Sequence, residues 1–293
     1  MRALPPSLVL TIAVVAGASM DATIKYLSQT NSVLLVAFGR YAFGALFSAL
    51  IYWRAGLPKI TAAMWRAHAL RGVVIAACAV TFFWALTVLP LAEAVTLSFI
   101  YPLLAPFVAW MLLGERVRRA SIAAAGLGFV GVVIAAQGAP STEDSPMHAL
   151  GVSAVLASAC LFALAMVLLR QRAQSDGPVI VSLMTSVIPG LLVAGPAIAF
   201  SAPPHPPDWP VFLMLGAFAA VFMYLMAAAY ARAEAQRLAP IHYTELLWAS
   251  AIGYVIFHET PRPQIYLGAA LIVAACLYVA YEERRLALRS QTT

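Results

Sequence analysis

The chain has 293 residues, of which 63% are hydrophobic and only 10% are charged, whereas about a quarter of the residues in a typical soluble domain are charged. This composition excludes a soluble globular enzyme and favours a protein whose surface faces lipid. The net charge of +6 does not indicate nucleic-acid binding, because the basic residues follow membrane topology, as described below.

Apolar runs of about 20 residues, the length that crosses a bilayer as a helix, follow one another along the chain. The runs are too long for strands, and lipid tolerates only helices and closed barrels, so we predict an all-α integral membrane protein. The first run has no small-residue cleavage site and is interpreted as a span, not a signal peptide. The predicted spans lie near residues 7–27, 33–53, 69–89, 92–113, 120–137, 149–170, 179–200, 209–231, 236–257 and 263–281.

The distribution of Lys and Arg gives the predicted orientation. With the N-terminus in the cytoplasm, 15 of the 18 basic residues fall in cytoplasmic segments, as the positive-inside rule requires. Arg262 lies in an outer loop, and Lys25 and Arg40 lie within spans. We therefore expect ten transmembrane helices in the cell (inner) membrane, with both termini cytoplasmic. The cytoplasmic set is Arg2, Arg54, Lys59, Arg66, Arg71, Arg116, Arg118, Arg119, Arg170, Arg172, Arg232, Arg237, Arg284, Arg285 and Arg289.

A weak internal repeat relates the two halves of the chain. The segment Ala85–Ala125 aligns without a gap to Ala229–Ala269, which matches Glu115 with Glu259. Each half then holds five helices, an odd number, so the second half enters the membrane from the opposite side. Such inverted repeats are typical of secondary transporters, whose cargo site lies near the midplane between the halves. We assign residues 1–140 to the first repeat, 147–285 to the second and 286–293 to a cytoplasmic tail.

Three segments of the first half, Ala85–Ala94, Tyr101–Pro102 and Leu113–Arg116, resemble the EamA-type branch of the drug/metabolite transporter superfamily. In that pattern a helix ends in a short Pro/Ala turn, and the next helix carries a mid-membrane proline and closes with Gly-Glu. The resemblance implies ten helices around a central cavity and transport, often efflux, of amino acids, related metabolites or drugs. The substrates of the superfamily are diverse.

Further positions carry the same resemblance more weakly. Lys25 and Arg40 in the first two helices, and the string Leu267–Ile272, look like the same family. The second half departs from the pattern at Leu246 and His258, which stand where the family has proline and glycine. These departures bear on whether the two halves move symmetrically, and not on the fold.

Three ionisable residues occupy the first two spans. Asp21 and Lys25 stand four residues apart on one helix face, a spacing suited to an internal pair, and Arg40 lies at comparable depth. Charges at this depth cost roughly 2.5–3.5 kcal/mol, so they face a partner or a cavity. We weigh two interpretations, a charge cluster that locks the helices together and a network that meets a substrate carboxylate or couples transport to protons.

Glu245 is the most informative single residue. It lies near the middle of the ninth span, His242 stands one turn before it, and the repeat maps this pair onto Ser98 and Tyr101 of the fourth span. Polar groups therefore coincide at matching midplane positions, where an inverted-repeat transporter binds cargo. A carboxyl group held away from water can exchange protons near neutral pH, so proton antiport at Glu245 is a hypothesis. His242 and Glu245 also have metal-ligand spacing, but no third ligand is evident, and we expect no metal or cofactor.

Prolines and aromatic residues complete the candidate site. Pro102 and Pro106 stand four residues apart in the fourth span, where proline removes a backbone hydrogen bond, so they are candidates for a static kink or for a hinge in alternating access. Trp84, Tyr224 and Trp248, with Tyr101, combine a large apolar body with a polar group. We predict that these four line the pathway beside Ser98, His242 and Glu245.

We therefore predict a secondary transporter, not an enzyme, that exports hydrophobic or aromatic amino acids, or related metabolites and drugs, by alternating access. The alternatives are an integral-membrane lipid-modifying enzyme and a facilitator or uptake carrier for another metabolite. The expected partners are a small-molecule substrate and the lipid bilayer. Gly126, Gly128 and Gly131 form a small-residue face on the fifth span, suited to close helix packing inside a monomer or between the subunits of a dimer.

Overall fold

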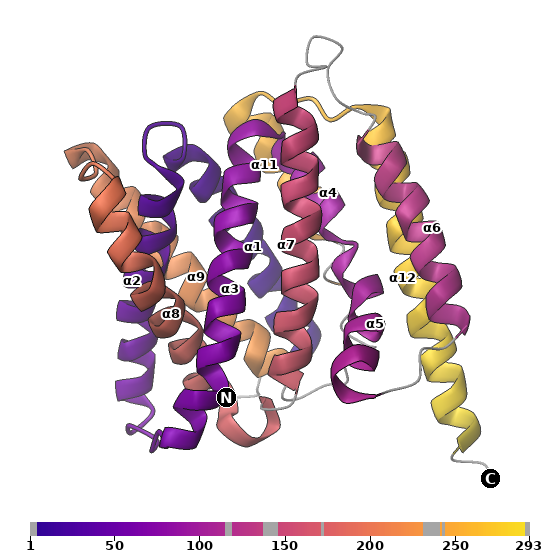
Figure 1. The fold of residues 1–293 in the computed structure, drawn as a ribbon, viewed down its shortest axis with the longest axis horizontal. Coiled ribbons are helices and arrows are strands. Elements are labelled where there is room, and N and C mark those ends of the chain that lie inside the picture. Colours follow the sequence, from indigo (N-terminus) through magenta and orange to yellow (C-terminus); the bar gives the residue numbers. More distant parts are fainter. Residues whose placement is uncertain are drawn as a thin grey trace.

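The computed structural model is built from helices that run roughly side by side (Figure 1). It describes residues 5–114, 119–136, 146–170, 173–230, 241 and 244–290, and none of these lies in a strand. The predicted all-α class is therefore confirmed for this part of the chain. The helices are α1 Pro6–Leu27, α2 Val33–Arg54, α3 Ala62–Val88, α4 Leu91–Ser98, α5 Tyr101–Leu113, α6 Arg119–Ala136, α7 Pro146–Arg170, α8 Ala173–Phe200, the short 3-10 helix η1 Pro206–Asp208, α9 Trp209–Tyr230, α11 Glu245–Phe257 and α12 Pro263–Ser290.

Local sequence accounts for where several helices begin and end. Ser32 and Thr61 precede α2 and α3, and their side-chain oxygens accept hydrogen bonds from the amides of Leu35 and Met64. Such caps satisfy amide groups that the first turn of a helix leaves unpaired. At the end of α5, Gly114 adopts a φ of 66°, the left-handed conformation that terminates many helices and that glycine adopts without strain.

The described chain contains many segments with the character of membrane spans. Seven helical segments have the length and apolarity to cross a membrane, and three shorter apolar helices lie at Ile122–Ala135, Glu245–Phe257 and Pro263–Tyr278. The shorter three fall where the fifth, ninth and tenth spans are predicted. The ten-helix count is thus not confirmed, because only seven segments in the described part meet the length and apolarity of a full span.

The fourth predicted span is not one continuous helix. It consists of α4 and α5, which are separated at Phe99 and Ile100. Pro102 therefore occupies the first turn of a new helix, where a proline sacrifices no hydrogen bond, while Pro106 lies inside α5. The sequence predicted a bend in this span, and the structure has a break.

The helices pair in a pattern that follows the internal repeat. The repeat matches α1, α2, α3, α4–α5 and α6 with α7, α8, α9, α11 and α12 in turn. Helix α1 packs on α9, and its repeat mate α7 packs on α3; α2 packs on α8, α4 on α11, and α6 on α12. The α1–α9 and α3–α7 contacts are mates of each other, and the α2–α8 and α6–α12 contacts map onto themselves, as a two-fold relation between the halves requires. The mate of the α4–α11 contact involves residues 235–242, most of which lie outside the described residues. Helix α7 runs downward in Figure 1 where α1 runs upward, consistent with the predicted inverted arrangement.

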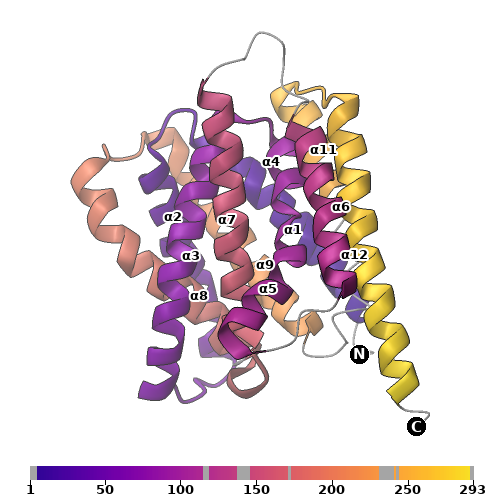
Figure 2. The same cartoon turned by 45° about the vertical axis from the view of Figure 1, so that its right-hand side comes forward.

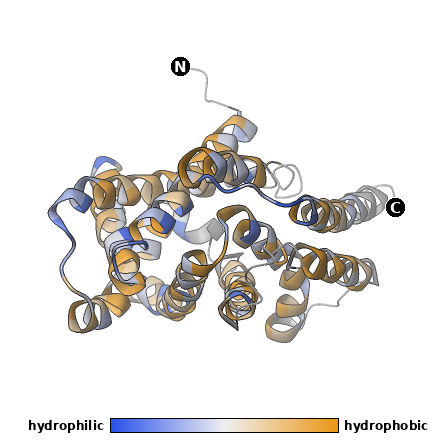
Figure 3. Cartoon of the chain, turned by 90° about the horizontal axis from the view of Figure 1, so that it is seen from above, coloured by the Kyte–Doolittle hydropathy of each residue, from blue (hydrophilic) through white to orange (hydrophobic). Residues whose placement is uncertain are grey.

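The outer surface of the bundle is apolar. Met111, Ile198 and Phe200 are each at least 75% exposed, which would be costly in water. Figure 3, which looks along the helices, shows hydrophobic residues predominating on them, with hydrophilic colour more frequent in the connecting segments. Helices α6 and α12 lie side by side at one edge in both Figure 1 and Figure 2.

The predicted small-residue face serves packing within the molecule. A Cβ added at Gly131 would lie 2.8 Å from the carbonyl oxygen of Gly268 on α12, and one at Gly128 would overlap the side chain of Leu103. Nothing lies within 4 Å of a Cβ built at Gly126. Two of the three glycines therefore hold α6 against its neighbours, and association into a dimer stays a prediction.

Candidate functional site

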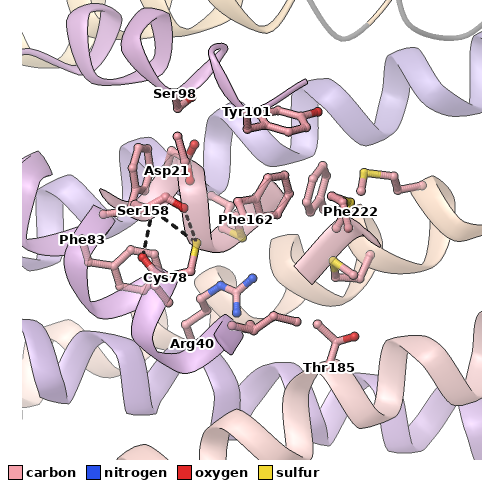
Figure 4. A pocket seen from close by; sticks show the side chains of 18 of the residues that line it. Asp21, Arg40, Cys78, Phe83, Ser98, Tyr101, Ser158, Phe162, Thr185 and Phe222 are labelled. Atoms are coloured by element: carbon pink, nitrogen blue, oxygen red, sulfur yellow. Dashed lines mark hydrogen bonds between the residues drawn. The ribbon is translucent and has the colours of Figure 1, made fainter. Parts of the chain in front are cut away.

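A cavity of about 170 Å³ lies at the centre of the helical arrangement, where both halves contribute (Figure 4). Its walls combine two carboxylic acids and two guanidinium groups with aromatic rings and methionines. The lining residues come from helices of both repeats. The residues that line it are Met20, Asp21, Arg40, Tyr41, Arg71, Ile75, Cys78, Ala79, Phe82, Phe83, Ser98, Phe99, Tyr101, Ser158, Ala159, Phe162, Met166, Thr185, Phe222, Met223, Met226 and Glu245.

Two equivalent helix starts meet the cavity. Tyr101 is the first residue of α5 and Glu245 the first residue of α11, and the two are repeat mates that both line the cavity. Both helices have 13 residues, and both end on a residue in the left-handed region, Gly114 with φ 66° and His258 with φ 56°. His258 thus reproduces the backbone of the glycine that the family pattern has there, so this departure in sequence is not a departure in structure.

The acidic groups of the cavity are Asp21 on α1 and Glu245 on α11. Among the described residues neither carboxylate forms an ion pair within 4 Å. The expected pairing of Asp21 with Lys25 is not present, because Lys25 pairs with Glu259 instead. Asp21 is 8% exposed, so its contact with solvent is through the cavity that it lines. His242 lies outside the described residues.

The basic groups of the cavity are Arg40 on α2 and Arg71 on α3. Arg40 stacks on aromatic faces, with its guanidinium carbon 4.5 Å from the centroid of Tyr41 and 6.0 Å from that of Phe83. Arg71 donates from Nη2 to Thr185 Oγ1 at 2.8 Å. The sequence placed Arg71 in a cytoplasmic segment; in the structure its side chain is 3% exposed and lines the cavity, and the side of the membrane on which it lies stays a prediction.

Aromatic and sulfur-containing side chains form the apolar walls. The ring of Tyr101 meets that of Phe162 edge to face, with centroids 4.7 Å apart, and Figure 4 shows both rings beside Phe222. Cys78 and Ser158 face each other across α3 and α7, with Sγ and Oγ 3.2 Å apart. Such walls suit an amphipathic cargo with a flat ring, because aromatic and thioether groups contact ring faces favourably.

An ion-paired cluster joins α1 to the start of α4 and the end of α11, and Lys25 and Glu259 do not line the cavity. Lys25 Nζ is 2.5 Å from Glu259 Oε1 and donates to the carbonyl oxygen of Leu89 at 2.7 Å. Glu259 Oε2 accepts from the amide of Leu91 at 2.9 Å, and Lys25 lies 5.4 Å from the ring centroid of Phe257. We call Lys25, Glu259 and these neighbours the upper cluster.

The predicted site residues divide into two groups. Asp21, Arg40, Ser98, Tyr101 and Glu245 line the cavity together. The remaining aromatic residues of the prediction do not line it, since Trp84 and Tyr224 are half-buried elsewhere and Trp248 is 40% exposed. The physical reason is the helix period of 3.6 residues, by which one position along the chain turns a side chain by about 100°.

Several lining residues were not predicted. On α3 they follow a helical stripe that the sequence does contain, with Arg71, Ile75, Cys78 and Phe82 three or four residues apart, the spacing of one helix face. On α7 the corresponding stripe is Ser158, Phe162 and Met166, at intervals of four residues. Polar residues at helical spacing within an apolar run are the signal that marks a cavity-facing side.

The comparison with protein families matches both halves of the chain. The profile of the EamA-like transporter family matches residues 5–137 and again 149–281. The two matched segments together cover most of the chain, and they correspond to the two repeats. The exact domain limits of 1–140 and 147–285 stay a prediction.

Curated relatives span almost the whole chain. A riboflavin transporter of Rhizobium johnstonii is 32% identical over 85% of this chain and 81% of its own length, and one of Brucella anthropi is 26% identical over 85% and 88%. An S-adenosylmethionine uptake transporter of Rickettsia bellii is 26% identical over 94% of this chain and 92% of its own. A solved crystal structure shares the fold with a TM-score of 0.67 at 21% identity, covering 96% of this chain and 98% of that chain.

Proposed function

The chain belongs to the EamA-like transporter family, and on that premise we propose that it is a secondary carrier for a small amphipathic metabolite with a flat ring. Membership of a transporter family argues against the alternative prediction of a lipid-modifying enzyme. The observation that supports this cargo is the central cavity, in which aromatic walls and four ionisable groups from both repeats surround one volume. A site shared by the two halves suits alternating access, because rocking one half against the other opens it to either side.

The relatives favour uptake of a heteroaromatic metabolite. Riboflavin and S-adenosylmethionine both carry fused ring systems, and the proteins named for them cover more than four-fifths of this chain. Rings of that kind stack on faces and edges such as those of Tyr101 and Phe162, which lie 4.7 Å apart. We therefore propose import of a ring-containing metabolite as the first candidate.

Export of aromatic amino acids is the second candidate. The cavity holds acidic groups, Asp21 and Glu245, and basic groups, Arg40 and Arg71. A zwitterion with an aromatic side chain presents an ammonium group to the first pair and a carboxylate to the second. This candidate shares the fold, the cavity and the carrier mechanism with the first, and differs from it in cargo and direction.

Proton coupling through the carboxylates is part of the proposal. Asp21 and Glu245 line the cavity without an ion-pair partner among the described residues, so their charge can change when cargo leaves. A proton bound there in one orientation of the carrier and released in the other would link the two fluxes. The prolines of α5 remain candidates for the pivot, since Pro106 removes the hydrogen bond to the carbonyl of residue 102.

Purified protein in liposomes tests the proposal. Radiolabelled riboflavin, S-adenosylmethionine and L-tryptophan are supplied outside or loaded inside, with and without a proton gradient. We expect saturable transport of at least one of the three, and accumulation that depends on the gradient. If none is transported at a rate above empty liposomes, the proposed cargo class is wrong.

Glu245→Gln tests the coupling. The amide keeps the size of the side chain and cannot release a proton, so we expect gradient-driven accumulation to vanish while exchange of labelled for unlabelled cargo continues. Accumulation at the wild-type level and with the wild-type pH profile would show that Glu245 does not couple transport to protons. The matched control is Glu282→Gln, near the end of α12, which should leave both activities unchanged.

A further inference from the structure

We propose that Arg40 and Arg71 form an anion-binding subsite of the cavity, which holds a carboxylate or phosphate group of the cargo. This inference rests on the proposed function, because it assumes that the cavity binds cargo. It adds the chemical feature that the cargo must carry. The two guanidinium groups come from α2 and α3 and line the same volume.

Both cations are buried, and the described residues bring no carboxylate within 4 Å of either. Arg40 is 8% exposed and Arg71 is 3% exposed. Within the described part of the chain neither forms an ion pair with a carboxylate within 4 Å, although Lys25 does. A charge taken out of water is costly unless it is paired and hydrogen-bonded. A cargo anion would supply the missing pair, so binding it would recover part of the cost of burying the two cations.

Each guanidinium also keeps an unused donor. The Nε atoms of Arg40 and Arg71 are buried and have no hydrogen-bond partner among the described residues. Buried donors in native structures are almost always satisfied by protein, water or ligand. Nε forms one edge of the planar fork with which arginine binds carboxylate and phosphate oxygens in pairs. Both Nε atoms are enclosed by protein in this structure, so an anionic cargo group would reach them only after neighbouring side chains shift.

A chain of hydrogen bonds holds Arg71 in place. Nη1 of Arg71 is 3.2 Å from Nδ1 of His68, and Nε2 of His68 is 3.0 Å from Oδ2 of Asp176. Because a guanidinium can only donate, Nδ1 must accept, and Nε2 then carries the proton that is donated to Asp176. Thr185 accepts from Nη2 and itself donates to the carbonyl oxygen of Val181. The scaffold thus uses the two Nη atoms of Arg71 and leaves Nε.

Stacking on two aromatic rings holds Arg40 in place at the wall of the cavity. The guanidinium lies over the ring of Tyr41 at 4.5 Å and near that of Phe83 at 6.0 Å. Contacts of this kind use the face of the guanidinium plane, whereas hydrogen bonds to an anion use its edge. Figure 4 shows the group in the middle of the cavity view, between Cys78 and Thr185. It is fixed by apolar neighbours and presented to the cavity.

The structural alternative is that Asp21 and Glu245 neutralise the two arginines. Both carboxylates line the same cavity, but neither lies within ion-pair distance of a guanidinium in the described structure. The carboxylates of the cavity come from α1 and α11 and the guanidinium groups from α2 and α3, and we call the two guanidinium groups the basic side of the cavity. A neutral cargo would leave the basic side unfilled, so the arrangement favours cargo that bears an anionic group beside its ring.

Two matched pairs of probes test the inference on the wild-type protein. Riboflavin 5′-phosphate and riboflavin differ by a phosphate, and L-tryptophan and L-tryptophanamide differ by a carboxylate. Binding to the detergent-purified full chain is measured by equilibrium dialysis. We expect the anionic member of at least one pair to bind at least about tenfold more tightly, because hydrogen bonds to a charged group are stronger than those between neutral groups. Equal or weaker binding of the anionic member in both pairs overturns the inference.

Three variants locate the effect. Arg40→Gln and Arg71→Gln should each reduce the preference for the anionic member to near unity, and Arg66→Gln, which alters an exposed arginine on the same helix α3, should keep it. A preference that survives both Gln variants overturns the inference. If Arg71→Gln fails to fold, Arg40→Gln and the wild-type comparison still decide. If riboflavin and tryptophanamide are transported but their anionic partners are not, the proposed carrier function stands and the anion subsite is wrong.

Discussion

The upper cluster and the basic side of the cavity both contain cations that lie within membrane-spanning helices, but the two regions differ in whether the protein supplies a counter-charge. Lys25 has a carboxylate at 2.5 Å and a carbonyl oxygen at 2.7 Å, whereas Arg40 and Arg71 have no carboxylate within 4 Å in the described chain. A cation that receives its partner from the protein joins helices together. A cation that receives none is available to a ligand.

The position of each group supports this difference. Glu259 pairs with Lys25 and also accepts from the amide of Leu91 at the start of α4, so one carboxylate connects three helices. Gly253 lies close against it, since a Cβ added there would be 3.2 Å from Glu259 Oε2. The arginines instead face a cavity. We therefore propose that the first group contributes to stability and the second to binding, and three substitutions test that division.

Glu259→Gln should have the largest effect on stability. It leaves Lys25 without its counter-charge, which costs about 3–5 kcal/mol for a fully buried pair. Because the Lys25 and Glu259 side chains are 12% and 21% exposed, solvent screening reduces the expected loss to about 2 kcal/mol. Thermal unfolding in detergent measures it. The double variant Lys25→Met/Glu259→Met removes both charges and should recover most of the loss, and a single variant as stable as wild type would contradict the role of the cluster.

Tyr101→Ala should weaken cargo binding by about tenfold, because it removes a ring that contacts Phe162 edge to face and lines the cavity. Trp84→Ala is the matched control, since Trp84 is also aromatic and half-buried but does not line the cavity. Affinity for riboflavin or L-tryptophan is measured on both. The proposed lining is wrong if Trp84→Ala lowers affinity as much as Tyr101→Ala does.

Arg40→Met should have the smallest effect on stability, within about 1 kcal/mol of wild type and in the direction of a gain, because it replaces a buried unpaired charge by an apolar side chain of similar length. Cargo transport should fall at the same time. Thermal unfolding and liposome transport are measured on the same preparation. A loss of stability as large as that of Glu259→Gln would show that Arg40 has a structural partner, and would remove the contrast between the two regions.

The repeat register explains why part of the cavity could be predicted. Ser98, Tyr101 and Glu245 were chosen because the repeat places them at matching depth, and all three line the cavity. Trp84, Tyr224 and Trp248 were chosen by residue type, which does not specify the face of the helix. The true lining residues lie close by in sequence, at Phe82, Phe83, Phe222 and Met223.

The break between α4 and α5 shows a different limit. Pro102 and Pro106 mark the span as irregular in the sequence, but either a bent or a broken helix satisfies that pattern. The structure has a break at Phe99 and Ile100. Ile100 directly precedes α5, just as its repeat mate Thr244 directly precedes α11. Helix α4 packs on α11 of the other half, a long-range contact that the local sequence does not specify.

The sequence by itself determined that the chain forms apolar helices, that it repeats, and that few charges enter the membrane, because composition and helical period are properties of neighbouring residues. Only the tertiary structure decided which of those charges are paired. Lys25 meets Glu259 from the other end of the chain, and Arg71 proved to face the cavity beside Thr185. Pairing depends on contacts between distant helices, and such contacts leave no local pattern in the sequence.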